Sequence, residues 1–146
     1  MANLQGGTGI YPDGGYLEQL GFFSAANLSS GGGSYYHIKT NVTHQSYAMI
    51  MIEAVGYNYG TALPIRCAWN FYCYSYFFGN VQNSAYAGAT AHSHYVAADN
   101  RIVIVMYASS LYYCGFTLNA YNTAGNGYGT IMSVVSAVQT GGTSYY

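Results

Sequence analysis

From residue 35 to the end of the chain, short apolar segments with strand-like alternation follow one another, separated by turns rich in glycine or asparagine. Strands are expected at 36–42, 47–57, 63–78, 89–96, 101–107, 112–121 and 130–138. No window carries a sustained helical stripe with capping residues. The sequence therefore predicts an all-β fold, an antiparallel β-sandwich of jelly-roll-like type.

The segment 47–57, YAMIMIEAVGY, shows the alternation best. One face would carry Met49, Met51, Glu53 and Val55, and the other would carry Ile50, Ile52 and Ala54. Because both faces are largely apolar, we expect a sheet that is covered on both sides.

Residues 1–34 differ from the rest because glycine-rich stretches such as GGTG and SSGGG interrupt them. We expect an extended N-terminal arm over 1–34 and a β-sandwich domain over 35–146. The arm would dock on a neighbouring subunit or a larger particle through its apolar anchors, which are Tyr16, Leu17, Leu20, Phe22 and Phe23. The octet that holds these anchors fits either a short helical turn or an extended segment.

Charge is scarce: the chain has three Lys or Arg and four Asp or Glu among its 146 residues. A solitary soluble domain normally has about a quarter of its residues charged. The surface must then consist of uncharged polar groups, or it must be hidden against other subunits. Nineteen tyrosines favour the second explanation, because tyrosine is enriched at interfaces. We therefore expect that the protein associates with copies of itself or with other subunits.

The same scarcity of charge excludes some partners. Three scattered basic residues cannot neutralise a run of phosphates, so nucleic-acid binding is not expected. The apolar runs are too short for a membrane span, and the N-terminus lacks the pattern of a secretory signal. We expect synthesis in a cytoplasm, no membrane insertion and no cofactor.

Three cysteines, Cys67, Cys73 and Cys114, cannot form a complete set of internal disulfides. Cys67 and Cys73 would lie on the same face of one strand, too far apart along it to bond. We interpret all three as small buried apolar side chains.

His92 and His94, in the motif HSH, would point to the same side of a strand and could share a metal ion, for example on a threefold axis. A solvated or hydrogen-bonded pair is the competing interpretation. His37 and His44 have no such neighbour, and we interpret them as structural residues.

Catalytic groups are not apparent, since the spacing of the four carboxylates brings no acid/base pair together. We expect that the protein is not an enzyme. Glu53, in an apolar strand, costs stability unless it is paired or faces water, and we interpret it as a member of a structural ion pair with Lys39 or Arg66. Exposed aromatic residues could stack on sugars or form an interface, and the candidates are Tyr57, Tyr59, Trp69 and Tyr72.

Five short motifs resemble a β-rich domain of virion structural proteins in marine bacteriophages. They are HIKTNV at 37–42, EAVGYNYG at 53–60, DNRIVIV at 99–105, YYCGFTLNAY at 112–121 and GNGYG at 125–129. The resemblance covers about residues 35–146. It implies a surface or tail-fibre-type protein, although the chain has no shaft, heptads or collagen-like triplets. Because phage surface proteins of this size are often trimeric, the resemblance also implies a homotrimer.

Together these observations predict a capsid decoration protein that sits on the virion surface and contacts the major capsid protein or another virion protein. A receptor-binding tail-fibre tip that binds host-surface glycan is the first alternative. A self-assembling tube or filament subunit, with the arm donated as a strand, is the second. A free sugar-binding module would instead be soluble alone.

Overall fold

The computed structural model describes residues 8–10, 15–25, 34–44, 48–74, 77–86, 90–109, 113–124, 133–140, 142 and 145–146. Side chains are described for 34–44, 49–73, 93–109, 113–121, 133–138, 142 and 145–146. The strands are β1 (Thr8–Ile10), β2 (Gly15–Ala25), β3 (Ser34–Thr43), β4 (Ala48–Asn58), β5 (Leu63–Tyr74), β6 (Phe77–Tyr86), β7 (Thr90–Val96), β8 (Arg101–Ala108), β9 (Cys114–Ala124) and β10 (Val134–Thr140). A 3-10 turn, η1 (Tyr59–Thr61), joins β4 to β5.

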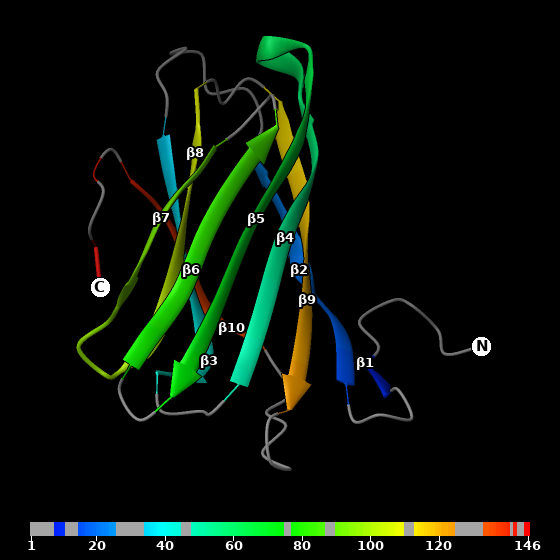
Figure 1. Ribbon diagram of the computed structural model, residues 1–146. Helices are drawn as coiled ribbons and strands as arrows, with labels where there is room; N and C mark the ends of the chain where they lie inside the picture. Colours follow the sequence, from blue (N-terminus) through cyan, green and yellow to red (C-terminus); the bar gives the residue numbers. More distant parts are fainter. Residues whose placement is uncertain are drawn as a thin grey trace.

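The strands form two sheets that pack face to face (Figure 1). The larger sheet has the order β1-β2-β9-β4-β5-β6, and the smaller has the order β10-β3-β8-β7. Every strand pair is antiparallel. The antiparallel β-sandwich predicted from the alternation is thus confirmed.

The jelly-roll part of the prediction is not confirmed. In a jelly roll most successive strands cross from one sheet to the other, as two Greek keys require. Here β4, β5 and β6 follow one another as neighbours within the larger sheet. Short connections favour such a meander, since antiparallel neighbours need only a hairpin.

The core fills the space between the sheets. It draws on the inward-facing positions of β3, β4, β5, β8 and β9, and its largest fully buried members include Trp69, Phe116, Ile38, Ile52, Ile104 and Leu118. The indole N–H of Trp69 donates to the backbone oxygen of Ser93 at 3.2 Å, which ties β5 to β7 across the two sheets. Gly56 is required in β4 because a Cβ there would collide with the backbone of β9.

Part of the predicted N-terminal arm belongs to the sheet. β2 pairs with β9 from Gly15 to Ala25, and β1 pairs with β2. The segment 16–23 is therefore extended rather than helical, and this part of the arm is a strand of the same sandwich. The side chains of its five predicted anchors, Tyr16, Leu17, Leu20, Phe22 and Phe23, lie outside the described residues.

The other predicted strands have counterparts in the structure, and one of them, 63–78, is divided between two strands. The aromatic run 63–78 contains the end of β5 at Tyr74 and the start of β6 at Phe77. No strand was predicted for β1, β2 or most of β6. Pro64 is the second residue of β5, as its missing N–H group predicts.

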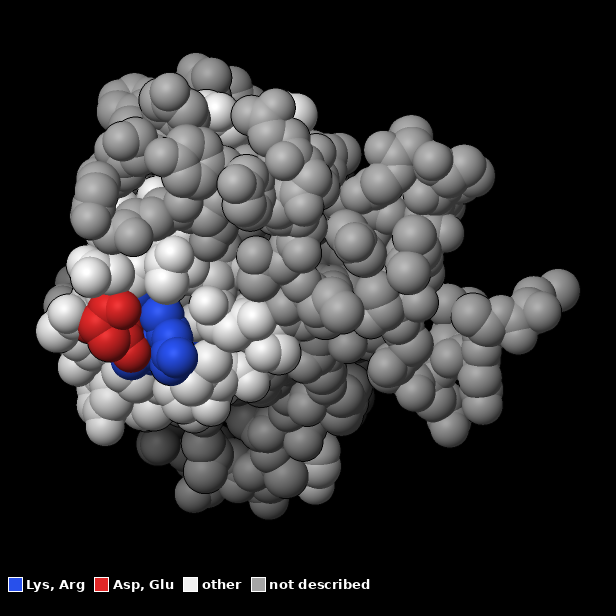
Figure 2. Space-filling model, turned by 90° about the horizontal axis from the view of Figure 1, so that it is seen from below, with Lys and Arg blue, Asp and Glu red and all other residues white. Residues whose placement is uncertain are grey.

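Charged side chains gather at one end of the smaller sheet. The amine of Lys39 lies 2.7 Å from the carboxylate of Asp99, and the guanidinium of Arg101 lies 3.7 Å from it. Figure 2, a view from below, shows red and blue side chains side by side in one patch with white described residues around them. The hydrogen bond from Lys39 is the main reason why the pKa of Asp99 is lowered. Among the described residues, no helix is long and apolar enough to cross a membrane.

Candidate functional site

The outer face of the larger sheet is exposed at many described positions of β4, β5 and β9. Along β4 the outward positions hold Met49, which is 53% exposed, then Met51, Glu53, Val55 and Tyr57. The expectation that both faces of this strand are covered is therefore wrong among the described residues. Ile50, Ile52 and Ala54 face the core, whereas Met49, Met51 and Val55 are exposed. We call the outward side of β5, β4 and β9 the open face.

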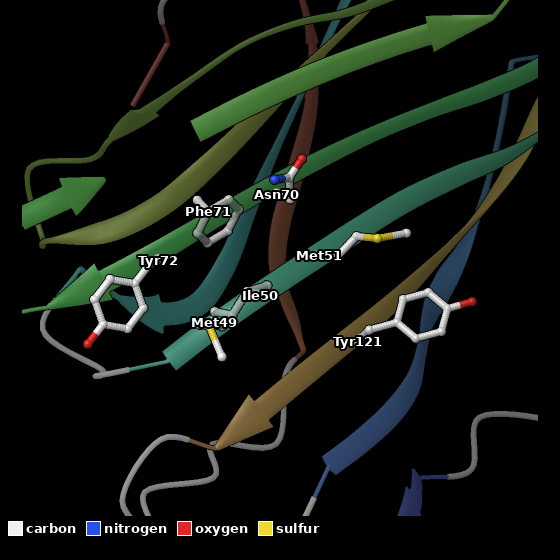
Figure 3. Close-up of a pocket in the computed structure, with 7 residues that line it drawn as sticks. All are labelled: Met49, Ile50, Met51, Asn70, Phe71, Tyr72 and Tyr121. Carbon is white, nitrogen blue, oxygen red and sulfur yellow. The ribbon is translucent and has the colours of Figure 1, made fainter. Parts of the chain in front are cut away.

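A groove lies at one end of the open face, with a volume of about 530 Å³. Its lining comes from three adjacent strands and consists of Met49, Ile50, Met51, Asn70, Phe71, Tyr72 and Tyr121. Figure 3 shows Tyr72 and Tyr121 on opposite sides of the two methionines. Ile50 and Phe71 belong to the core, so well-packed residues support the floor of the groove.

Glu53 lies next to this groove. The hydroxyl of Tyr121 donates a hydrogen bond of 2.9 Å to the Glu53 carboxylate. The predicted ion pair of Glu53 with Lys39 or Arg66 is therefore wrong: Lys39 lies on the smaller sheet and pairs with Asp99. Because the Glu53 carboxylate is partly exposed, it retains some hydration, and one hydrogen bond from a phenol is enough to stabilise its charge. A fully buried carboxylate would need a nearby cation.

The opposite end of the open face carries exposed aromatic rings. Tyr59 lies between Tyr57 and Tyr113, with ring centroids 6.4 Å and 6.2 Å away in edge-to-face contacts. Tyr113 has a φ of 49°, a left-handed conformation that is costly for a bulky residue. Val55 continues the apolar surface toward the middle of the sheet. We call Val55, Tyr57, Tyr59 and Tyr113 the tyrosine patch.

The outer face of the smaller sheet is covered by the chain itself. Val103 and Val105 pair with Lys39 and His37 on this face, away from the core cluster. Even so, Val103, Val105 and His37 are completely buried. Residues near the C-terminal end lie over them, and we call this side the covered face.

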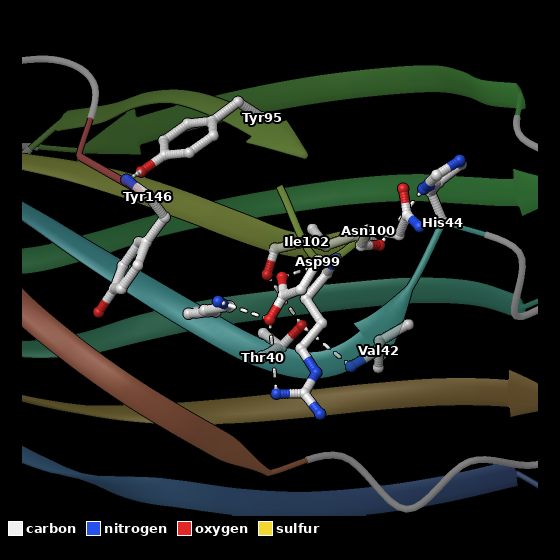
Figure 4. Close-up of polar contacts among 10 residues, drawn as sticks. Thr40, Val42, His44, Tyr95, Asp99, Asn100, Ile102 and Tyr146 are labelled. Carbon is white, nitrogen blue, oxygen red and sulfur yellow. Dashed lines mark hydrogen bonds and ion pairs between the residues drawn. The ribbon is translucent and has the colours of Figure 1, made fainter. Parts of the chain in front are cut away.

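Hydrogen bonds hold that covering segment in place. His37 Nε2 donates to the backbone oxygen of Gly142 at 2.8 Å, so His37 Nδ1, 3.1 Å from the Tyr95 hydroxyl, accepts from it in the neutral ring. The same hydroxyl oxygen accepts the backbone N–H groups of Tyr145 and Tyr146, at 3.3 Å and 3.1 Å. Figure 4 shows the Tyr95 hydroxyl beside the backbone of Tyr146. His37 is thus a structural residue, as predicted.

His44 is structural as well. Its backbone N–H donates to the oxygen of Asn100 at 3.1 Å, and its Nδ1 lies 3.3 Å from the same oxygen. These contacts close the turn before β8 against the end of β3 (Figure 4).

The four predicted surface aromatics do not form one site. Trp69 is fully buried in the core, so its assignment to a sugar-binding surface or interface is wrong. Its position in β5 puts it on the inward face, where a large apolar ring is most stabilising. Tyr72 lines the groove, while Tyr57 and Tyr59 belong to the tyrosine patch. Tyr57 and Tyr72 lie eight positions apart along the β4–β5 ladder, about 26 Å.

The histidine pair lies at an irregularity in β7. The register with β8 shifts between Ala91 and Ser93, so the simple alternation that would align the two imidazoles is interrupted there. His94 pairs with Ile104, a core residue, and burial lowers the pKa of its imidazole. The side chain of His92 lies outside the described residues. Among the described side chains, no group of three His, Cys, Asp or Glu could hold a metal ion.

The cysteines are as predicted: Cys67, Cys73 and Cys114 are free and buried. Burial raises the pKa of Cys67 and of Cys73 to about 12, so their reactive thiolate forms are scarce near neutral pH.

Of the seven residues that line the groove, sequence reasoning proposed only Tyr72 as a binding residue and missed the other six, which are Met49, Ile50, Met51, Asn70, Phe71 and Tyr121. The alternation had placed the two methionines on one face with Glu53. Pairing with Asn70 and Tyr121 was the missing information, because register between strands cannot be read from one strand alone.

In comparisons with known proteins, no family model, no curated protein and no solved structure matches this chain.

Proposed function

We propose that the protein is a non-enzymatic structural protein that decorates a larger particle and assembles as a homotrimer through the tyrosine patch. The observation that carries this proposal is the contrast between the two outer faces. The chain covers one face with its own residues but leaves apolar side chains exposed on the other. Such an exposed apolar surface is typical of interaction sites.

The chemistry of the tyrosine patch suits a protein partner. Tyrosines supply large, stiff contact areas and are frequent anchors of interfaces. Tyr59 is 56% exposed, so most of its gain from burial is available to a partner. The strained backbone of Tyr113 is tolerated where its ring is presented beside Tyr59, which supports a role for the ring itself.

The particle would be a virion, as the resemblance to bacteriophage surface proteins suggests. The four residues of the tyrosine patch are uncharged, although the exposed Arg66 lies opposite Val55. Contacts between uncharged groups respond little to salt, which suits a particle in seawater. A protein that binds only the assembled shell stabilises that shell by mass action. The tube or filament alternative relies on the N-terminal segment as a donated strand, and this segment, as β2, pairs with β9 of the same chain.

The test is the mass of the purified protein in solution, by light scattering after size exclusion. We expect three times the chain mass, unchanged between roughly 0.1 M and 1 M NaCl. Tyr59→Ala should weaken association by at least about tenfold. The matched control is Tyr145→Ala, because Tyr145 is equally exposed, 56%, but lies with the covered face.

A monomeric wild type at high concentration would contradict self-assembly. A trimer that survives Tyr59→Ala and Tyr113→Ala unchanged would contradict the tyrosine patch as its contact.

A further inference from the structure

The groove on the open face combines a defined hollow with a mixed lining. Its volume of about 530 Å³ lies within the range of roughly 300–1,000 Å³ that is typical of small-molecule sites. From this lining we propose that the groove binds a neutral sugar ring.

The apolar part of the lining matches one face of a pyranose. Tyr72 and Tyr121 stand on either side of Met49 and Met51 (Figure 3). A pyranose has one face of C–H groups, which can pack against phenol rings and polarizable thioethers. Because the tyrosines lie on opposite sides, a ring between them would contact apolar atoms along its face and at both ends.

The polar part of the lining matches the hydroxyls around a sugar. Asn70 is exposed, and its amide offers two donors and one acceptor. Beside the groove, the hydroxyl of Tyr121 donates a hydrogen bond to the carboxylate of Glu53. Glu53 thereby fixes the direction of the Tyr121 hydroxyl before any ligand arrives.

The charge of the site indicates a neutral ligand. None of the lining residues carries a formal charge. The nearby carboxylate of Glu53 would repel uronic acids and other anionic sugars. A neutral hexose or N-acetylhexosamine therefore fits better than an acidic sugar.

The groove is preorganised and separate from the tyrosine patch. It is built on three hydrogen-bonded strands, β5, β4 and β9, with the core residues Ile50 and Phe71 beneath it. Rigid sites lose less entropy on binding. Glu53 separates Met51 of the groove from Val55 of the tyrosine patch along β4. Sugar binding and trimer assembly can therefore succeed or fail independently.

The test is an NMR titration of protein with labelled methionine methyl groups. Probes are the methyl glycosides of glucose, galactose, mannose and N-acetylglucosamine, together with lactose and cellobiose. Titration should extend to about 50 mM, because a single ring is expected to bind in the millimolar range. We expect saturable shifts of the Met49 and Met51 methyls with at least one probe. The methyl of Met106, fully buried in the core, should not shift.

Three variants complete the test. Asn70→Ala and Tyr72→Ala should each weaken binding by about tenfold or more, because each removes one class of contact. Tyr145→Ala, on the other side of the molecule, should bind as the wild type does. An unchanged Met106 signal shows that each variant is folded. The proposal is overturned if no probe shifts Met49 and Met51, or if binding survives both groove substitutions.

Discussion

The two outer faces of this sandwich are built from similar strands but differ in how far other residues of the chain cover them. On the smaller sheet, Val103 is fully buried because the C-terminal residues lie over it. On the larger sheet, Val55 is 39% exposed. Val103 in β8 and Val55 in β4 both point outward from their own sheets, and they differ in whether other residues of the chain cover them.

This difference indicates that the two faces have different roles. On the covered face, hydrogen bonds of the Tyr95 hydroxyl link His37 to the backbone of Tyr145 and Tyr146. On the open face, many side chains are exposed to solvent. We infer that the covered face contributes to stability and that the open face is available to partners.

The sharpest test of this comparison is the same substitution on both faces. Val103→Ala should lower the free energy of unfolding by about 2–3 kcal/mol, because it removes two fully buried methyl groups and leaves a cavity. Val55→Ala should change it by less than about 0.5 kcal/mol, as is usual for exposed positions. Chemical denaturation of both variants measures the two values. Equal losses would show that something in the monomer covers both faces alike.

The sequence predicted the core better than the surface. Alternation alone placed Ile50 and Ile52 of β4 together on the face that proves to be buried, because burial follows a period of two within one strand. It did not predict that Met49 and Met51 stay exposed, because cover depends on segments far away in the chain. The covered valines, Val103 and Val105, depend on residues about 40 positions later.

The candidate site was harder to predict for the same reason. Trp69 looked like a surface aromatic, but the parity of β5 relative to the core decides its side, and that parity is fixed only by pairing with β4. Tyr72, three positions further on, falls on the other face and lines the groove. The abundance of tyrosine predicted a tyrosine-rich surface, but it did not predict where on the molecule that surface lies.

The second test removes the central hydroxyl of the covered face. Tyr95→Phe keeps the ring but loses one donated and two accepted hydrogen bonds. We expect a loss of about 1–3 kcal/mol in the free energy of unfolding, because His37 Nδ1 is left buried without its donor. Amide hydrogen exchange at Tyr145 and Tyr146 should also become faster.

Tyr107→Phe is the matched control for this change. Tyr107 lies on the same face, with its ring centroid 4.8 Å from that of Tyr35 and the two rings tilted by 45°, and its hydroxyl has no hydrogen-bond partner among the described residues. Its substitution should leave stability and exchange nearly unchanged. If the two variants behaved alike, the Tyr95 hydroxyl would not be what holds the covering segment.

The smallest expected effect concerns the charged edge of the covered face, where Lys39 contacts both Asp99 and the ring of Tyr146. The hydrogen bond from Lys39 lowers the pKa of Asp99 in the folded protein. A carboxyl group with a lowered pKa stabilises the fold above its unfolded pKa of about 4, and this contribution is lost as the pH falls further. Asp99→Asn should therefore be slightly less stable than the wild type at pH 7, and the two should converge in acid. Denaturation midpoints from pH 7 to about pH 2.5 measure this.

A difference that stays constant over this range would show that the ion pair does not stabilise the covered face. Because Asp99 is exposed, salt should shrink the difference at pH 7, whereas the larger effect of Tyr95→Phe should not respond to salt.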